Sequence, residues 1–136
     1  MNAGPLIALR TAVRARLVGD AGLTALLGGE RVYDEAPRGA TLPYVTFAEA
    51  AARAWPEGGS PGHAHEFSLV AWSEQGGDSE ALAIVDAMAA LLDDAPLAPA
   101  GHRLVLLRVA AQETARPDAE GRRRATLRLE ALTEPA

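Results

Sequence analysis

The chain has 136 residues, with 13 basic against 18 acidic side chains and no cysteine. This length predicts one domain over residues 1–136, and a hydrophobic content of 49% is enough to form a core. The lack of cysteine excludes disulfides and thiolate metal sites, and a net charge of −5 argues against a surface that grips nucleic-acid phosphates.

Two helices are expected at the N-terminus. Pro5 suits the first turn of a helix that Gly19 ends, and Asp20 can cap a second helix that runs to Gly28. The following apolar residues are expected on the buried face of the first helix: Leu6, Leu9, Val13 and Leu17. The N-terminus has no basic leader, and arginines interrupt its apolar residues, so we expect neither a signal peptide nor a membrane span.

The next segment predicts two strands and a loop. Residues 31–34 read as a short strand, and Pro43 opens a second strand over residues 44–47. From residue 50 to residue 62 the chain is rich in alanine, glycine and proline, which predicts a long exposed loop. Trp55 and Pro56 lie in this loop, and we expect them to contact a partner because aromatic residues dominate interface hot spots.

The rest of the chain predicts a strand, a helix and a hairpin. Residues 65–73 form the strand, with Phe67 on one side and Trp72 on the other, and the helix covers about residues 80–92. The hairpin joins residues 103–114 to residues 122–132. Its inward residues are expected to be Val105, Leu107, Val109, Ala111, Ala125, Leu127, Leu129 and Ala131.

This order of elements predicts an α+β fold. We expect a mainly antiparallel sheet of four to five strands, with two to three helices packed on one face.

Motifs of catalytic type are present but incomplete. Residues 58–62 (GGSPG) match the nucleophile elbow of hydrolases, but Pro61 has no N–H for an oxyanion hole, so we interpret them as a loop tip. His63 and His65 could share a side and hold a metal, but no third ligand is evident, and we interpret them as polar strand-edge residues. We therefore expect no catalytic, cofactor or metal site.

One basic cluster remains, made by three consecutive arginines and Arg128. Strand alternation places Arg122, Arg124 and Arg128 on the outer face of the sheet. The cluster lacks interleaved aromatic residues, which weakens its reading as a nucleic-acid site. A solvated face, a protein contact and a phosphate site remain open, in that order, and we take these arginines together with Trp55, Trp72 and Pro56 as candidate interface residues.

Three segments resemble a known family, in the order in which they occur there. They are residues 21–47 (AGLTALLGGERVYDEAPRGATLPYVTF), residues 69–77 (LVAWSEQGG) and residues 129–134 (LEALTE). This series resembles the tail-completion, or tail-terminator, proteins of long-tailed phages and of phage-derived gene transfer agents. The resemblance covers nearly the whole chain, but its motifs mark turns and the ends of helices and strands, and they indicate no active site.

The resemblance implies an assembly role. The protein would form a homo-oligomeric ring, expected to be a hexamer, that caps the tail tube protein and ends its polymerisation. The ring would present a surface to the head-completion (stopper) protein and would let DNA pass through its channel without specific binding. The protein would be made in the bacterial cytoplasm and become part of a virion or gene-transfer-agent particle, with no cofactor, enzyme activity or membrane contact. The alternative is a small cytoplasmic α+β enzyme or ligand-binding domain.

Overall fold

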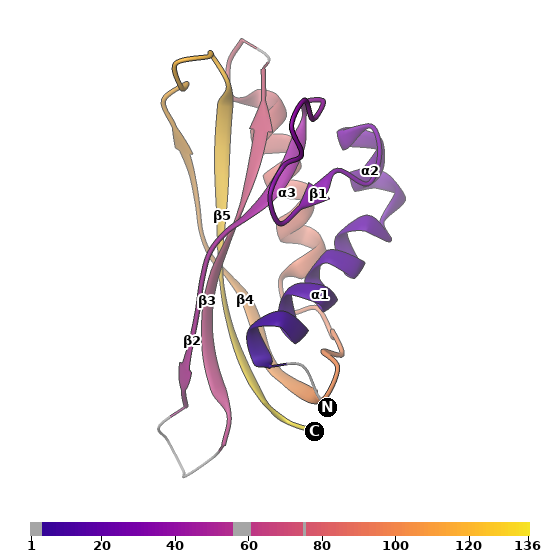
Figure 1. The fold of residues 1–136 in the computed structure, drawn as a ribbon, viewed down its shortest axis with the longest axis vertical. Helices are drawn as coiled ribbons and strands as arrows, with labels where there is room; N and C mark the ends of the chain where they lie inside the picture. The colour runs from indigo at the N-terminus through magenta and orange to yellow at the C-terminus, as the bar shows by residue number, and fades with distance from the viewer. Residues whose placement is uncertain (1–3, 56–60, 75) are drawn as a thin grey trace.

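The computed structural model describes residues 4–55, 61–74 and 76–136 (Figure 1). Its helices are α1 (Pro5–Val18), α2 (Ala21–Leu27) and α3 (Ser79–Leu92). Its strands are β1 (Val32–Tyr33), β2 (Tyr44–Ala54), β3 (His63–Ser73), β4 (His102–Ala115) and β5 (Arg123–Pro135). The elements follow one another in the predicted order.

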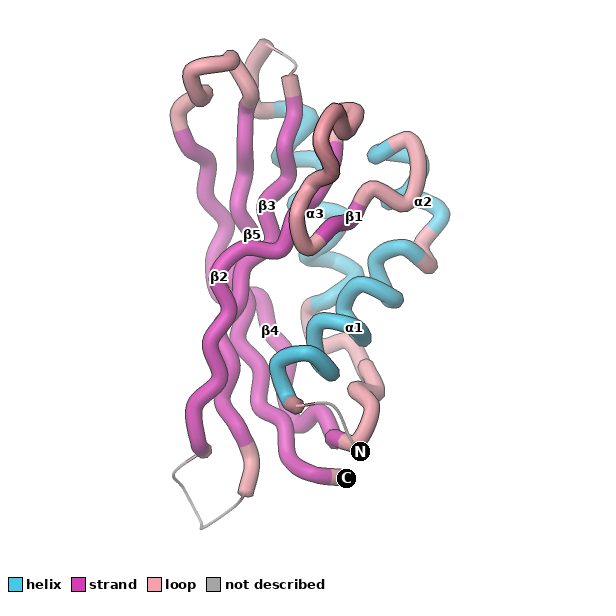
Figure 2. Tube along the Cα trace, viewed as in Figure 1, coloured by secondary structure: helices cyan, strands magenta, loops and turns pink. Residues whose placement is uncertain are grey.

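The strands form one sheet in the order β1-β2-β3-β5-β4. β1 is parallel to β2, and the other neighbours are antiparallel. Figure 2 shows the helices on one side of the sheet, with the other side left open. The prediction of an α+β fold, with a mainly antiparallel sheet and helices on one face, is confirmed.

Local signals in the sequence account for the helix ends. Pro5 occupies the first turn of α1, and the Asp20 carboxylate caps α2 by accepting a hydrogen bond from the Leu23 N–H at 2.9 Å. Gly28 ends α2 at φ +81°, a left-handed conformation that glycine adopts without steric cost. None of the helices in the described part of the chain is long and apolar enough to cross a lipid bilayer.

The core lies between the helices and the covered face of the sheet. Its inward strand residues alternate with outward polar ones in β5, as the sequence predicts for Leu127 and Leu129, which are 0% and 1% exposed. The helices contribute aliphatic side chains from one face each, among them Val13, Leu17, Ile84, Met88 and Leu92. Burial of this aliphatic surface is the main source of folding free energy.

The prediction of an irregular chain from residue 50 is wrong, because β2 continues to Ala54. The alanines of this segment have little intrinsic preference for a strand. Pairing with β3 holds them extended, in a register that places Ala51 opposite Glu66 and Ala54 opposite His63. The predicted loop over residues 50–62 therefore begins only after Ala54.

The predicted alternation in β4 is also partly wrong. Two β-bulges, one between Leu104 and Leu106 and one between Val109 and Ala111, shift the register against β5. Val105 is consequently 41% exposed, and Ala111 pairs with the outward Arg128. Leu6 departs from prediction as well: it is 41% exposed, because the first turn of α1 borders a surface groove.

Candidate interaction surfaces

The uncovered face of the sheet carries rows of oppositely charged side chains. Arg108 of β4 lies 2.6 Å from Glu130 of β5, and Arg53 of β2 lies 3.9 Å from Glu66 of β3. These pairs are exposed, so each contributes little to folding stability. Their effect is to keep this face polar while it has no helix over it.

At one end of this face, two of the predicted arginines gather around Trp72. The guanidinium carbon of Arg122 lies 5.2 Å from the centre of the Trp72 ring, and that of Arg124 lies 5.8 Å from it. The indole N–H of Trp72 donates to the Thr46 hydroxyl at 3.0 Å, and Tyr44 packs beside the ring. We refer to Trp72, Arg122 and Arg124 as the tryptophan–arginine patch.

The turn before β5 fixes one arginine of this patch. The Asp118 carboxylate accepts hydrogen bonds from the backbone N–H and the Nε of Arg122, at 3.0 and 2.8 Å. The pKa of Asp118 is lowered, chiefly because the backbone N–H of Arg122 donates to its carboxylate. Arg124 has no carboxylate partner among the described residues, so it is the cation of the patch that can meet an external anion.

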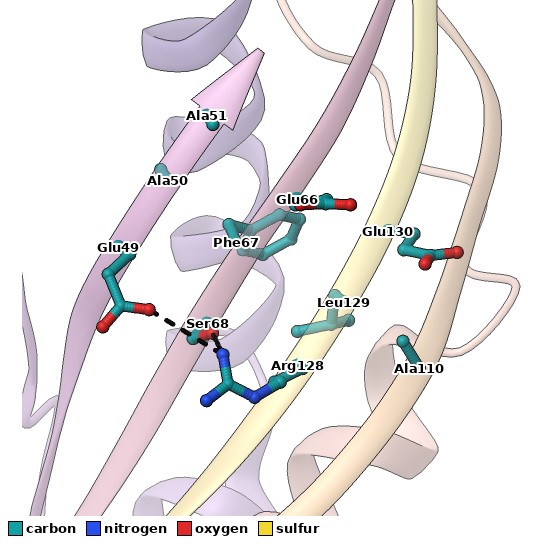
Figure 3. Close-up of a pocket in the computed structure, with 10 residues that line it drawn as sticks. All are labelled: Glu49, Ala50, Ala51, Glu66, Phe67, Ser68, Ala110, Arg128, Leu129 and Glu130. Atoms are coloured by element: carbon teal, nitrogen blue, oxygen red, sulfur yellow. Dashed lines mark hydrogen bonds and ion pairs between the residues drawn. The ribbon is translucent and has the colours of Figure 1, made fainter. Parts of the chain in front are cut away.

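Arg128 lies apart from the patch, four residues beyond Arg124 along β5 and opposite Ser68 of β3. Figure 3 shows its side chain beside Ser68 and Glu49. Its guanidinium pairs with Glu113 of β4 and lies 3.8 Å from Glu49 of β2. It also donates to the Ser68 hydroxyl at 3.4 Å, on one side of a shallow hollow of about 330 Å³. The basic cluster predicted from the sequence is therefore two separate features. Arg122 and Arg124 both contact the indole of Trp72, whereas Arg128 forms ion pairs with carboxylates of its own chain.

Trp55 lies at the opposite end of the sheet from the tryptophan–arginine patch. It follows β2 directly, is half-buried, and its backbone N–H donates to the Gly62 carbonyl at 2.9 Å. Figure 1 shows the end of β2 and the start of β3 at the lower end of the sheet and the β4–β5 turn at the upper end. Pro56 and most of the GGSPG segment lie outside the described residues.

The interpretation of His65 as a strand-edge residue is wrong. It lies in the central strand β3, is 2% exposed, and its Nε2 is 2.8 Å from the Thr133 hydroxyl oxygen. Its Nδ1 is buried without a hydrogen-bond partner. Burial, with smaller contributions from His63 and His102, lowers the pKa of His65 from 6.5 to about 4. A histidine with this pKa is neutral at neutral pH, and no group of three or more metal-ligating side chains surrounds it or any other described residue.

Comparisons with known proteins agree with the resemblance in the sequence. The family model "Tail completion protein gp17" matches residues 11–134, a range that runs from α1 to β5. A chain in a solved structure entitled "Virion of native gene transfer agent (GTA) particle" matches with a TM-score of 0.85 and 29% identity. That match covers 95% of this chain and 96% of the other.

None of the curated proteins matches the chain. The family match alone spans most of the described fold, including both hairpins and α3. The chain therefore belongs to the family of the tail completion protein gp17, whose members are structural proteins of phage tails.

Proposed function

We propose that the protein closes the tail tube of a phage-like or gene-transfer-agent particle as a ring. Six copies are expected to form this ring, to end polymerisation of the tube protein and to join the tail to the head-completion protein. The observation that supports this most is the likeness, over 95% of the chain, to a protein of a gene-transfer-agent virion. The whole chain, residues 1–136, would act as one domain in this role.

The open strand edges suit addition of further subunits. β1 pairs only with Val45 and Thr46, so the rest of β2 forms an edge with no strand beside it among the described residues. At the other edge, Asp93 caps β4 by accepting from the Val109 N–H at 2.9 Å, whereas residues 110–115 are exposed. Exposed strand edges favour association with other chains.

The two candidate contact sites lie at opposite ends of the subunit. A protein that joins a tube to a head needs two different contacts, one with each partner. Trp55 at one end and the tryptophan–arginine patch at the other supply such a pair, and the free cation Arg124 suits an acidic partner surface. The net charge of −5 favours a channel through which DNA slides without specific binding.

We also infer that the protein is not an enzyme. The polar groups that could suggest chemistry have structural partners: the Glu80 carboxylate accepts a hydrogen bond from the Ser73 hydroxyl at 2.6 Å, and His65 pairs with Thr133. The alternative of a small enzyme or ligand-binding domain has no specific observation in its favour among the described residues.

Deletion of the gene tests the proposed function. Particles made without the protein should have tails of variable length that are not attached to heads, and supplying the wild-type protein should restore both properties. Electron microscopy gives the tail lengths and the fraction of joined particles. Normal tails on normal heads in the deletion strain would refute the role.

Trp55→Ala is expected to weaken binding to tube ends or to the head-completion protein by about 30-fold. Loss of an interface hot spot costs about 2 kcal/mol of binding free energy, which corresponds to this factor. The half-buried indole contributes little to the core, so the midpoint of urea unfolding should change little. Binding is measured by co-sedimentation with tubes and by pull-down of the head-completion protein. Leu26→Ala, which removes a 45% exposed side chain on α2, is the matched control. Equal binding by both variants would exclude Trp55 from the interface.

A further inference from the structure

A groove of about 700 Å³ runs along α1 on the side that faces β2. Leu6 and Ile7 line one end of it and are 41% and 66% exposed. Val18 lies at the other end of the helix, and Ala50 of β2 lines the groove from the sheet. Exposed aliphatic side chains that gather in a hollow are typical of a surface that another protein covers.

The same groove carries a net positive charge, because Arg10, Arg14 and Asp34 are the charged residues that line it. α1 contains three arginines and no acidic residue. Arg14 lines the groove, and its Nε donates to the Val32 carbonyl at 2.9 Å, which fixes the side chain there. The guanidinium carbon of Arg10 lies 4.8 Å from the centre of the Phe47 ring, and its Nη1 lies 3.5 Å from the Asp34 carboxylate. Arg14 has no carboxylate partner among the described residues, so the groove suits an acidic occupant.

The opposite side of the helix layer has the complementary character. α3 contains Glu80 and Asp86 and no basic residue, and Asp93 follows it directly. Leu82 is 36% exposed. Asp86 follows Leu82 by four residues and Asp93 follows Asp86 by seven, so the three residues share one face of the helix. The carboxylate of Asp93 binds the backbone of β4, so this face of α3 lies toward the β4 edge.

The two surfaces lie on opposite flanks of one subunit. α1 packs against β1 and β2, whereas α3 packs against β3, β4 and β5. β1 and β4 are the two ends of the sheet. A contact between these flanks therefore joins two copies head to tail, and such a contact generates a ring when its rotation closes.

We propose that the α3 face bearing Leu82 and Asp86 of one copy docks into the α1 groove of the next copy in the ring. This inference rests on the proposed function, since it names the surfaces by which the ring closes. The exposed Leu82 would meet the aliphatic side chains of the groove, and Asp86 would meet Arg14. Docking of the groove on a second groove would instead oppose arginine to arginine, which disfavours a symmetric dimer through this surface.

Cysteine cross-linking tests the proposal, because the natural chain has no cysteine. Thr11→Cys in the groove is combined in turn with a cysteine at Leu82, Ala83 or Ala90, positions spread along the exposed side of α3. A disulfide within one chain leaves the mass of the monomer unchanged on a non-reducing gel, so it is distinguished from a link between two copies. We expect at least one pair, oxidised while bound to tube ends, to give a ladder of covalent oligomers that stops at the full ring. Each single variant should give at most a dimer, and Thr11→Cys with Thr126→Cys on the open sheet face is the matched control.

A charge change gives an independent readout. Asp86→Arg is expected to reduce ring formation at tube ends at least about tenfold by opposing the arginines of the groove. Glu30→Arg, the same reversal of charge at an exposed residue between α2 and β1, should leave ring formation unchanged. If the cysteine variants stop tube growth but no pair cross-links, and Asp86→Arg assembles normally, the docking surface is wrong and the capping function stands. If the wild-type protein neither binds nor stops tubes, the capping function fails, and this inference fails with it.

Discussion

Changing Arg124 and Arg128 together to glutamate is expected to give tails of uncontrolled length, or tails that do not join heads, from a protein that still folds. Both side chains project from the open face of β5, and Arg124 stacks on Trp72 without a carboxylate partner among the described residues. Arg128→Glu also places a carboxylate beside Glu113 and Glu49. The expected loss of folding stability is therefore about 1 kcal/mol, typical of exposed charges that come to repel.

Complementation of a deletion strain measures the assembly effect, with tail lengths and head–tail joining counted by electron microscopy. The free energy of unfolding in urea checks that the variant is folded. Arg53→Glu with Arg108→Glu is the matched control, since it makes the same charge change elsewhere on the open face. Normal particles from the Arg124 and Arg128 variant would show that these arginines belong to a solvated face that contacts no partner.

Acid is expected to destabilise the protein through His65. The unfolded chain takes up a proton on this histidine below pH 6.5, whereas the folded protein does so only below about pH 4, because burial lowers the pKa of His65. Between these values the unfolded state binds more protons, so stability falls as the pH decreases through this window and is unaffected by His65 above it. The expected loss from this group is about 3 kcal/mol, given about 1.4 kcal/mol for each pH unit.

Urea unfolding at a series of pH values measures this loss. His65→Gln keeps a polar side chain near the Thr133 hydroxyl but does not titrate, so its stability should depend less on pH between 6.5 and 4. Ala64→Gln, which introduces the same side chain at the neighbouring position of β3 without removing a titratable group, should keep the wild-type profile. A His65→Gln profile as steep as that of the wild type would show that other groups cause the acid sensitivity.

The order of elements could be predicted because its signals are local. The Asp20 cap, the left-handed Gly28 and the proline at the start of α1 each act within a few residues. The second half of β2 could not be predicted in the same way. Its alanines are extended because β3 lies beside them, and this depends on a contact between segments that the sequence pattern does not specify.

The candidate surfaces were predictable to a similar extent. Alternation placed Trp72 and Arg124 on the outer face, but their contact depends on the register between β3 and β5, which pairs these two residues directly. The separation of Arg128 from this patch follows from the same register, together with the carboxylates that β2 and β4 bring to it. The opposite charges of α1 and α3 are visible in the sequence, but their places on opposite flanks appear only in the fold.

The most direct test of tube capping uses tubes assembled from the tube protein alone. Purified protein is added to them, more tube protein is then supplied, and the tube ends are imaged by electron microscopy. We expect one ring of six copies at one end of each tube and no further growth from that end. Tubes that grow from both ends at an unchanged rate, or protein bound along their sides, would contradict the proposed function.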